Sequence, residues 1–82
     1  MTVGTKPKLP TDLTGQEVRK ALERRGFVFR RQKGSHIVMA SIDPPGRVVV
    51  PDHKAVRTGT LRQIISYAGL TVEDFLAAIR GE

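Results

Sequence analysis

The sequence predicts a small α+β domain with the order α-β-β-β-α, in which a three-stranded antiparallel sheet carries its helices on one face and a short extra helix ends the chain. Apolar residues recur at helical spacing near both ends, and between them lie segments rich in β-branched residues separated only by short turns. A chain of 82 residues has room for one domain of two layers. We therefore expect residues 1–82 to form one domain, with a flexible lead-in at residues 1–8.

The first helix is expected at about residues 15–25. Thr14 and Glu17 have the spacing of a capping box, in which each side chain accepts a hydrogen bond from the backbone N–H of the other residue. The apolar residues that follow share one helical face: Val18, Ala21 and Leu22. Gly26 is placed to end this helix in the left-handed conformation.

Three short strands are expected next. They are too short for helices and rich in aromatic and β-branched residues, and they lie at residues 27–33, 36–41 and 47–50. Gly34 and Ser35 form the first break, residues 43–46 form a proline-rich turn, and Pro51 ends the third strand. Because the turns are short, consecutive strands should pair in antiparallel fashion.

A polar loop at residues 52–59 separates the strands from two further helices. Thr60 and Gln63 have capping-box spacing, so the second helix is expected to begin at Thr60 and to end at Gly69. Thr71 precedes a short last helix with acidic residues in its first turn, where they favour the helix dipole. Since each helix has a single apolar face, the helices should cover one face of the sheet and leave the other available.

The charge and composition of the chain narrow the classes of function. Fourteen Lys and Arg against eight Asp and Glu give a net charge of +6, which favours nucleic acid first and acidic protein second as partners. The absence of cysteine excludes thiol catalysis and thiolate metal sites, and it fits the reducing cytoplasm, where we expect the protein to act. Two histidines and dispersed carboxylates predict neither a metal site nor a cofactor, and no apolar run approaches the ~20 residues of a membrane span.

The most informative segment runs from Arg30 to His36. It combines cations, a glycine, a hydroxyl and an imidazole, and these suit a phosphodiester: guanidinium groups match phosphate oxygens, glycine admits a close backbone, and imidazole moves protons near neutral pH. Its residues alone favour a plainer interpretation, a solvated basic hairpin with an incidental histidine. His53 is either a loop histidine tied to Asp52 or, if the third strand returns beside the second, a neighbour of His36.

From Lys8 onward the chain resembles the HicA-type mRNA interferase toxins of bacterial and archaeal toxin–antitoxin modules. The resemblance is carried, in order, by residues 9–10, 21–27, 31–36, 50–53, 59–64 and 68–70. It implies a fold like that of double-stranded-RNA-binding domains, RNA cleavage that depends on the histidine at the position of His36, and silencing by a HicB-like antitoxin protein.

With this resemblance, the sequence predicts a metal-independent endoribonuclease that cleaves mRNA and inhibits translation and growth until its antitoxin binds. His36 is the expected catalytic residue, transferring a proton as a 2′-hydroxyl attacks the adjacent phosphate. The residues expected to bind RNA are Arg30, Arg31, Lys33, Gly34, Ser35 and His53. Two alternatives remain: a non-catalytic RNA-binding module of the same fold, and an interaction protein whose basic face docks an acidic partner.

Overall fold

The computed structural model describes residues 8–43 and 45–82 and confirms the predicted order of elements. The elements are α1 (Gly15–Arg24), β1 (Val28–Lys33), β2 (His36–Ile42), β3 (Pro45–Pro51), α2 (Thr58–Tyr67) and α3 (Val72–Ile79). The lead-in expected to be flexible, residues 1–8, lies outside the described residues except for Lys8. Within the described ranges, every helix is too short or too polar to cross a membrane.

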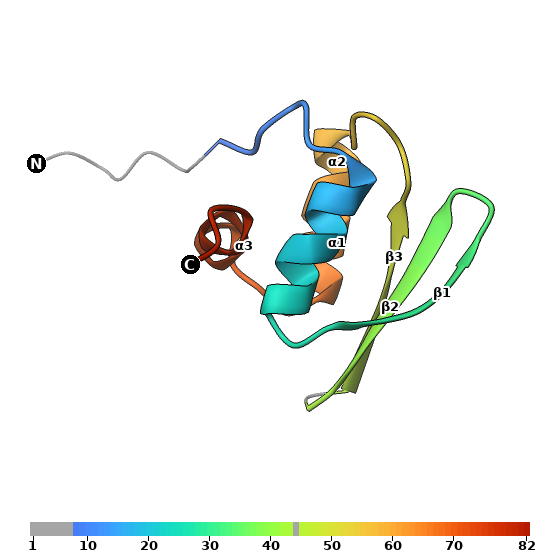
Figure 1. The fold of residues 1–82 in the computed structure, drawn as a ribbon. Coiled ribbons are helices and arrows are strands. Elements are labelled where there is room, and N and C mark those ends of the chain that lie inside the picture. Colours follow the sequence, from blue (N-terminus) through green and yellow to red (C-terminus); the bar gives the residue numbers. More distant parts are fainter. Residues whose placement is uncertain (1–7, 44) are drawn as a thin grey trace, which may run out of the picture.

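The structure has two layers, a sheet and a group of helices. The three strands form one antiparallel sheet in the order β1-β2-β3, and all three helices lie on the same side of it (Figure 1). Fully buried side chains from both layers fill the space between them, among them Leu22, Ile37, Met39, Val48, Leu61 and Phe75. The arrangement is the predicted one, consistent with the fold of double-stranded-RNA-binding domains, and the other face of the sheet stays open.

Local sequence sets the start of α1 but not the start of α2. At α1 the capping box is confirmed, because the Thr14 hydroxyl accepts from the Glu17 N–H at 3.1 Å and the Glu17 carboxylate accepts from the Thr14 N–H at 2.9 Å. The capping box predicted at Thr60 is wrong, since α2 already begins at Thr58 and has no side-chain cap. Tertiary structure explains the early start: Val56 is buried, and its N–H donates to the Leu13 carbonyl at 2.7 Å.

An irregularity in β1 decides which of its side chains share a face. The pairing with β2 shifts register between Phe29 and Arg31, which leaves Arg30 as the extra residue of a β-bulge. If Arg30 also paired with a residue of β2, side chains would alternate regularly along β1. Arg31 would then lie on the helix-covered face together with Phe29. The bulge instead places Arg31 and Lys33 on the open face, where Lys33 pairs with His36.

The third strand is longer than predicted. It runs from Pro45 to Pro51, and these two prolines pair with Ile42 and His36 of β2. An edge strand tolerates proline because the backbone N–H groups along its outer side need no partner strand. The turn predicted at residues 43–46 therefore extends too far, and Pro44 within it lies outside the described residues.

Candidate active site

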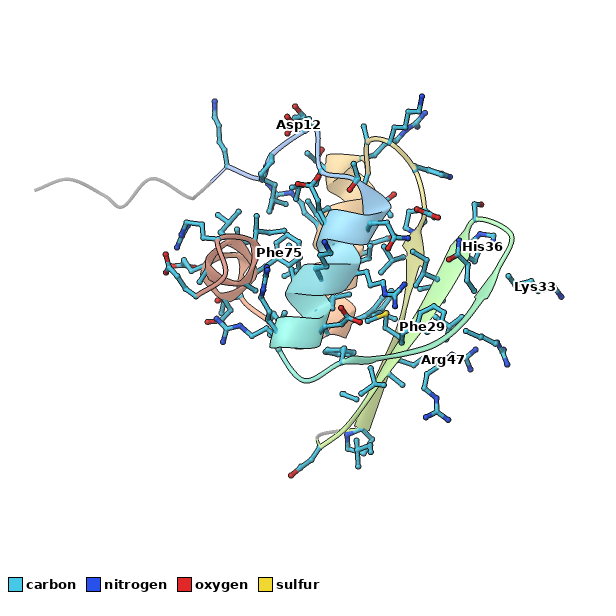
Figure 2. All side chains as sticks on the ribbon, viewed as in Figure 1. Asp12, Phe29, Lys33, His36, Arg47 and Phe75 are labelled. Atoms are coloured by element: carbon cyan, nitrogen blue, oxygen red, sulfur yellow. The ribbon has the colours of Figure 1, made fainter. Side chains whose placement is uncertain are left out.

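His36 stands at the start of β2 on the open face of the sheet. Its neighbour Ile37 is fully buried against the helices, so strand alternation points the exposed imidazole of His36 the other way. Lys33 pairs with His36 on one side and Pro51 pairs with it on the other. Figure 2 shows His36 and Lys33 at the end of the sheet formed by the β1–β2 turn, remote from Phe75 in the helical layer.

A hollow beside His36 gathers residues from β3, the following loop and α2. It has a volume of about 420 Å³, in the size range of small-ligand sites. Its lining consists of His36, Val49, Pro51, His53, Ala55, Arg57 and Thr60. The return of β3 beside β2 thus brings the two histidines to one hollow. His53 is therefore a neighbour of His36, which is the second of the two positions considered for it from the sequence. Arg57 contributes an additional cation to this hollow. From the sequence, Arg57 was expected only to belong to a polar loop.

Asp52 holds the turn that carries His36. Its carboxylate accepts hydrogen bonds from the side-chain amides of Gln32 at 2.9 Å and Gln16 at 3.3 Å. Its backbone N–H donates to the Ser35 carbonyl at 2.7 Å. Through these contacts Asp52 ties the turn to β1 and to the first turn of α1, which limits how far His36 can move.

Gly34 and Ser35 form the turn itself. Gly34 has a φ of 58°, in the left-handed region that favours glycine, and its carbonyl accepts a hydrogen bond from the Gln32 side chain at 3.0 Å. No atom lies within 4 Å of where a Gly34 Cβ would stand, so the turn is open to a ligand. The exposed Ser35 belongs to the same accessible turn.

Gly15 seats α1 against the end of β3. Its N–H donates to the His53 carbonyl at 2.9 Å. A Cβ added at Gly15 would overlap with the carbonyl oxygen of Pro51, so the close approach of the two backbones requires glycine. This contact fixes the backbone at His53, which is one wall of the hollow.

The cations of the sheet differ from those of the helical layer in their partners. In the described parts of the chain, ion pairs join Arg19 to Glu23, Arg25 to Asp74 and Arg80 to Glu82, all outside the sheet. No ion pair is formed there by the exposed cations of the sheet, which are Arg30, Arg31, Lys33 and Arg47. The open face therefore presents positive charge that no carboxylate neutralises.

Arg47 is an exposed cation of the open face that sequence reasoning missed. It lies in an apolar segment and has no neighbouring basic residue to draw attention to it. The signal was present in the alternation, since Val48 is buried and Arg47 must then point to the open face, where it pairs with Ala40.

The chain matches a known protein family. A comparison with curated proteins finds no match. A comparison with protein families matches residues 15–70 to the family described as "HicA toxin of bacterial toxin-antitoxin". The matched range covers more than half of the 82 residues and includes all three strands, both histidines and the hollow beside them. The chain therefore belongs to the HicA toxins of bacterial toxin–antitoxin systems, whose partner is an antitoxin.

Proposed function

We propose that the protein is an endoribonuclease that cleaves mRNA without a metal ion and uses His36 for proton transfer. The observation that carries the proposal is an exposed imidazole on an open sheet face whose cations form no ion pair within residues 8–43 and 45–82. Cleavage of mRNA would stop translation and growth, and a HicB-like antitoxin would end the inhibition by covering this face.

The reaction we propose is an internal transesterification. The 2′-hydroxyl of one nucleotide attacks the adjacent phosphorus, the bond to the 5′-oxygen breaks, and a 2′,3′-cyclic phosphate remains. One proton leaves the 2′-hydroxyl and one reaches the departing 5′-oxygen. His36 performs one of these two transfers, a contribution that typically accelerates a reaction by about 10²–10⁴-fold.

The distribution of the oxygen donors supports the metal-independent route that we propose. Within residues 8–43 and 45–82, no group of three or more histidines or carboxylates is arranged to hold a metal ion. The carboxylate nearest the hollow, Asp52, has both oxygens engaged by glutamine amides. The charge needed to stabilise the phosphate would therefore come from cations.

The proposed RNA contacts begin beside His36 and continue along the open face of the sheet. Lys33 stands directly opposite His36 in the neighbouring strand, and Arg31 follows on the same face. The remaining members of the predicted contact set are Arg30, Gly34, Ser35 and His53. Guanidinium and ammonium groups beside a reacting phosphate can bind the phosphates next to it, while the glycine turn admits the RNA backbone closely.

The test is cleavage of a long single-stranded RNA by the purified protein in the presence of EDTA. The wild type should yield fragments on a denaturing gel and His36→Ala should not. Arg62→Ala, which removes an exposed cation of α2 away from the open face, is the matched control and should cut like the wild type. Intact RNA in all lanes, with a retarded band on a native gel, would contradict the proposal that the protein is an enzyme. That result would favour an RNA-binding module.

A further inference from the structure

We propose a second RNA-binding site on the open face, in which Arg47, Arg30 and Arg31 bind a backbone phosphate of single-stranded RNA several nucleotides from the bond held at His36. The inference rests on the proposed function and deepens it, because it specifies the form of the RNA and the length that the protein recognises. It also gives a role to Arg47, which lies apart from the hollow beside His36.

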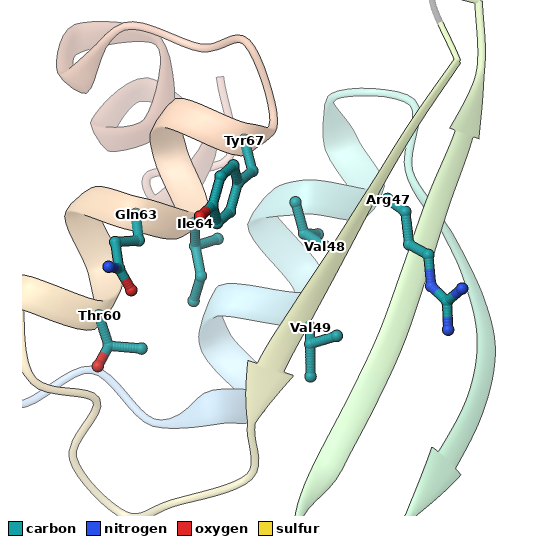
Figure 3. A pocket seen from close by; sticks show the side chains of 7 residues that line it. All are labelled: Arg47, Val48, Val49, Thr60, Gln63, Ile64 and Tyr67. Carbon is teal, nitrogen blue, oxygen red and sulfur yellow. The ribbon is translucent and has the colours of Figure 1, made fainter.

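The site is a hollow lined mostly by arginines. Its lining consists of Arg30, Arg31, Val38, Ala40 and Arg47. The bulge of β1 supplies two of the arginines from one side of β2, and β3 supplies the third from the other side. Figure 3 shows the guanidinium of Arg47 directed over β2 and away from Gln63 and Tyr67 of α2.

The charge of this hollow favours an anion. Three arginines line it, and each is exposed and without an ion pair in the described chain. Like charges so arranged repel one another until an anion lies between them. Guanidinium forks match the oxygens of a phosphate, and the aliphatic floor made by Val38 and Ala40 leaves those oxygens no other partner.

The distance from His36 to Arg47, at the far end of the second hollow, sets the length of RNA that the whole site can hold. Arg31 and Val38, at the near end of this hollow, lie closer to His36. Ala40, which pairs with Arg47, stands four residues after His36 on β2. At about 3.4 Å per strand residue, the two positions are separated by roughly 14 Å. Stacked nucleotides advance about 3.4 Å each, so roughly four nucleotides cover the span, and fewer suffice in an extended strand.

The same distance favours a single strand over a duplex. Both hollows are lined by open-face residues of the sheet, His36 and Val49 in one and Val38 and Ala40 in the other, so both phosphates must face the sheet. A duplex turns once in about ten base pairs, and along one of its strands four nucleotides would rotate a phosphate by more than a third of a turn, away from the sheet. A single strand can instead follow β2 with its backbone toward the protein.

The experiment combines substrate length with substitution. The cut site is mapped first in a long RNA. Three oligonucleotides are then made that share a short core around this site. One consists of the core alone, one carries four extra nucleotides on its 5′ side, and one carries four on its 3′ side. We expect an extension on one side to raise kcat/KM about tenfold for the wild type and for Arg62→Ala, as for one charge-assisted contact. Arg47→Ala should lose that gain and still cut the short core like the wild type.

Each other outcome has a definite meaning. An equal loss for Arg47→Ala on short and extended oligonucleotides, or no gain from extension, would overturn the second site while leaving the nuclease intact. If the wild type cuts no RNA, the proposed function fails, and fluorescence anisotropy of single-stranded oligonucleotides of increasing length tests the site alone: a gain in affinity with length that Arg47→Ala removes and Arg62→Ala keeps supports it. Tighter binding of a duplex, or an Arg47→Ala effect confined to antitoxin binding, would overturn it.

Discussion

The two faces of the sheet differ in exposure and charge, although both are drawn from the same strands. Toward the helices, Ile37 and Met39 of β2 are 0% exposed, whereas His36 of the same strand and Arg47 of β3 are exposed to solvent. Alternation along a strand is the cause, because successive side chains leave it in opposite directions. Stability and the proposed chemistry are therefore separated between neighbouring residues, and substitution can alter one without the other.

The largest effects are expected from the neighbours His36 and Ile37. His36→Ala should lower RNA cleavage about 10²–10⁴-fold and leave the urea midpoint of unfolding unchanged, since the imidazole is exposed. Ile37→Ala should lower the free energy of unfolding by about 2–5 kcal/mol, because it opens a cavity in the core. Ile37→Val, at about 0.5–1.5 kcal/mol, keeps the protein folded and should cleave RNA at the wild-type rate. Loss of cleavage in Ile37→Val would contradict the separation of the two faces.

A pair of glycines gives the next largest effect. Gly15→Ala should lower the free energy of unfolding by about 1–3 kcal/mol, because the new methyl group overlaps with the Pro51 carbonyl and forces α1 away from the end of β3. Gly59→Ala is the matched control, since it lies in α2 with no atom within 4 Å of its Cβ position. That change should raise the free energy of unfolding by about 0.5–1 kcal/mol. Thermal unfolding of both variants measures the contrast, and equal shifts would contradict it.

Substitution of Asp52 tests how firmly the turn must hold His36. Asp52→Ala removes the acceptor of two side-chain hydrogen bonds and should lower kcat about tenfold with little change in KM, at about 0.5–1.5 kcal/mol per bond. Asp52→Asn should restore most of kcat, because an amide oxygen still accepts from Gln32 and its NH2 group can pair with a rotated Gln16 amide. Amide hydrogen exchange at Gly34 should be faster only in Asp52→Ala. A loss of kcat in Asp52→Asn equal to that in Asp52→Ala would show that the carboxylate charge, and not the hydrogen bonding, matters.

The smallest effect is expected in the salt dependence of RNA binding. Each phosphate contact of a single strand contributes about 0.7 to the slope of log affinity against log salt concentration. Lys33→Ala should therefore reduce that slope by about 0.7, whereas Arg62→Ala, remote from the open face, should leave it nearly unchanged. Fluorescence anisotropy titrations at four or more salt concentrations measure both, and equal slopes for wild type and Lys33→Ala would remove Lys33 from the contact set.

Local sequence predicted the elements and the open face well, but it could not predict register. The apolar spacing around Leu22 and the capping box at Thr14 depend only on nearby residues, and both were confirmed. The start of α2 was predicted wrongly because the burial of Val56 outweighs the local signal at Thr60.

The sequence left parts of the candidate site open for a related reason. The face taken by Arg31 depends on a one-residue bulge, and nothing in a run of two arginines distinguishes the residue that is left out of the pairing. The hollow beside His36 depends on the register in which β3 pairs with β2, which single-sequence patterns leave undetermined. Arg57 was missed because its role as a lining residue exists only once that register has formed, whereas Arg47 was missed although strand alternation indicated its face.

The bulge at Arg30 gives this chain a position where its length can change by a single codon. Loss of that codon would regularise β1 and keep Phe29 opposite Met39 and Arg31 opposite Val38, so the pairing of the strand would survive intact. Only one cation of the open face would be removed. Deletion of this codon should therefore yield a weakened toxin that still folds. Such a mutation would let the strength of the toxin be adjusted to that of its antitoxin in a small step.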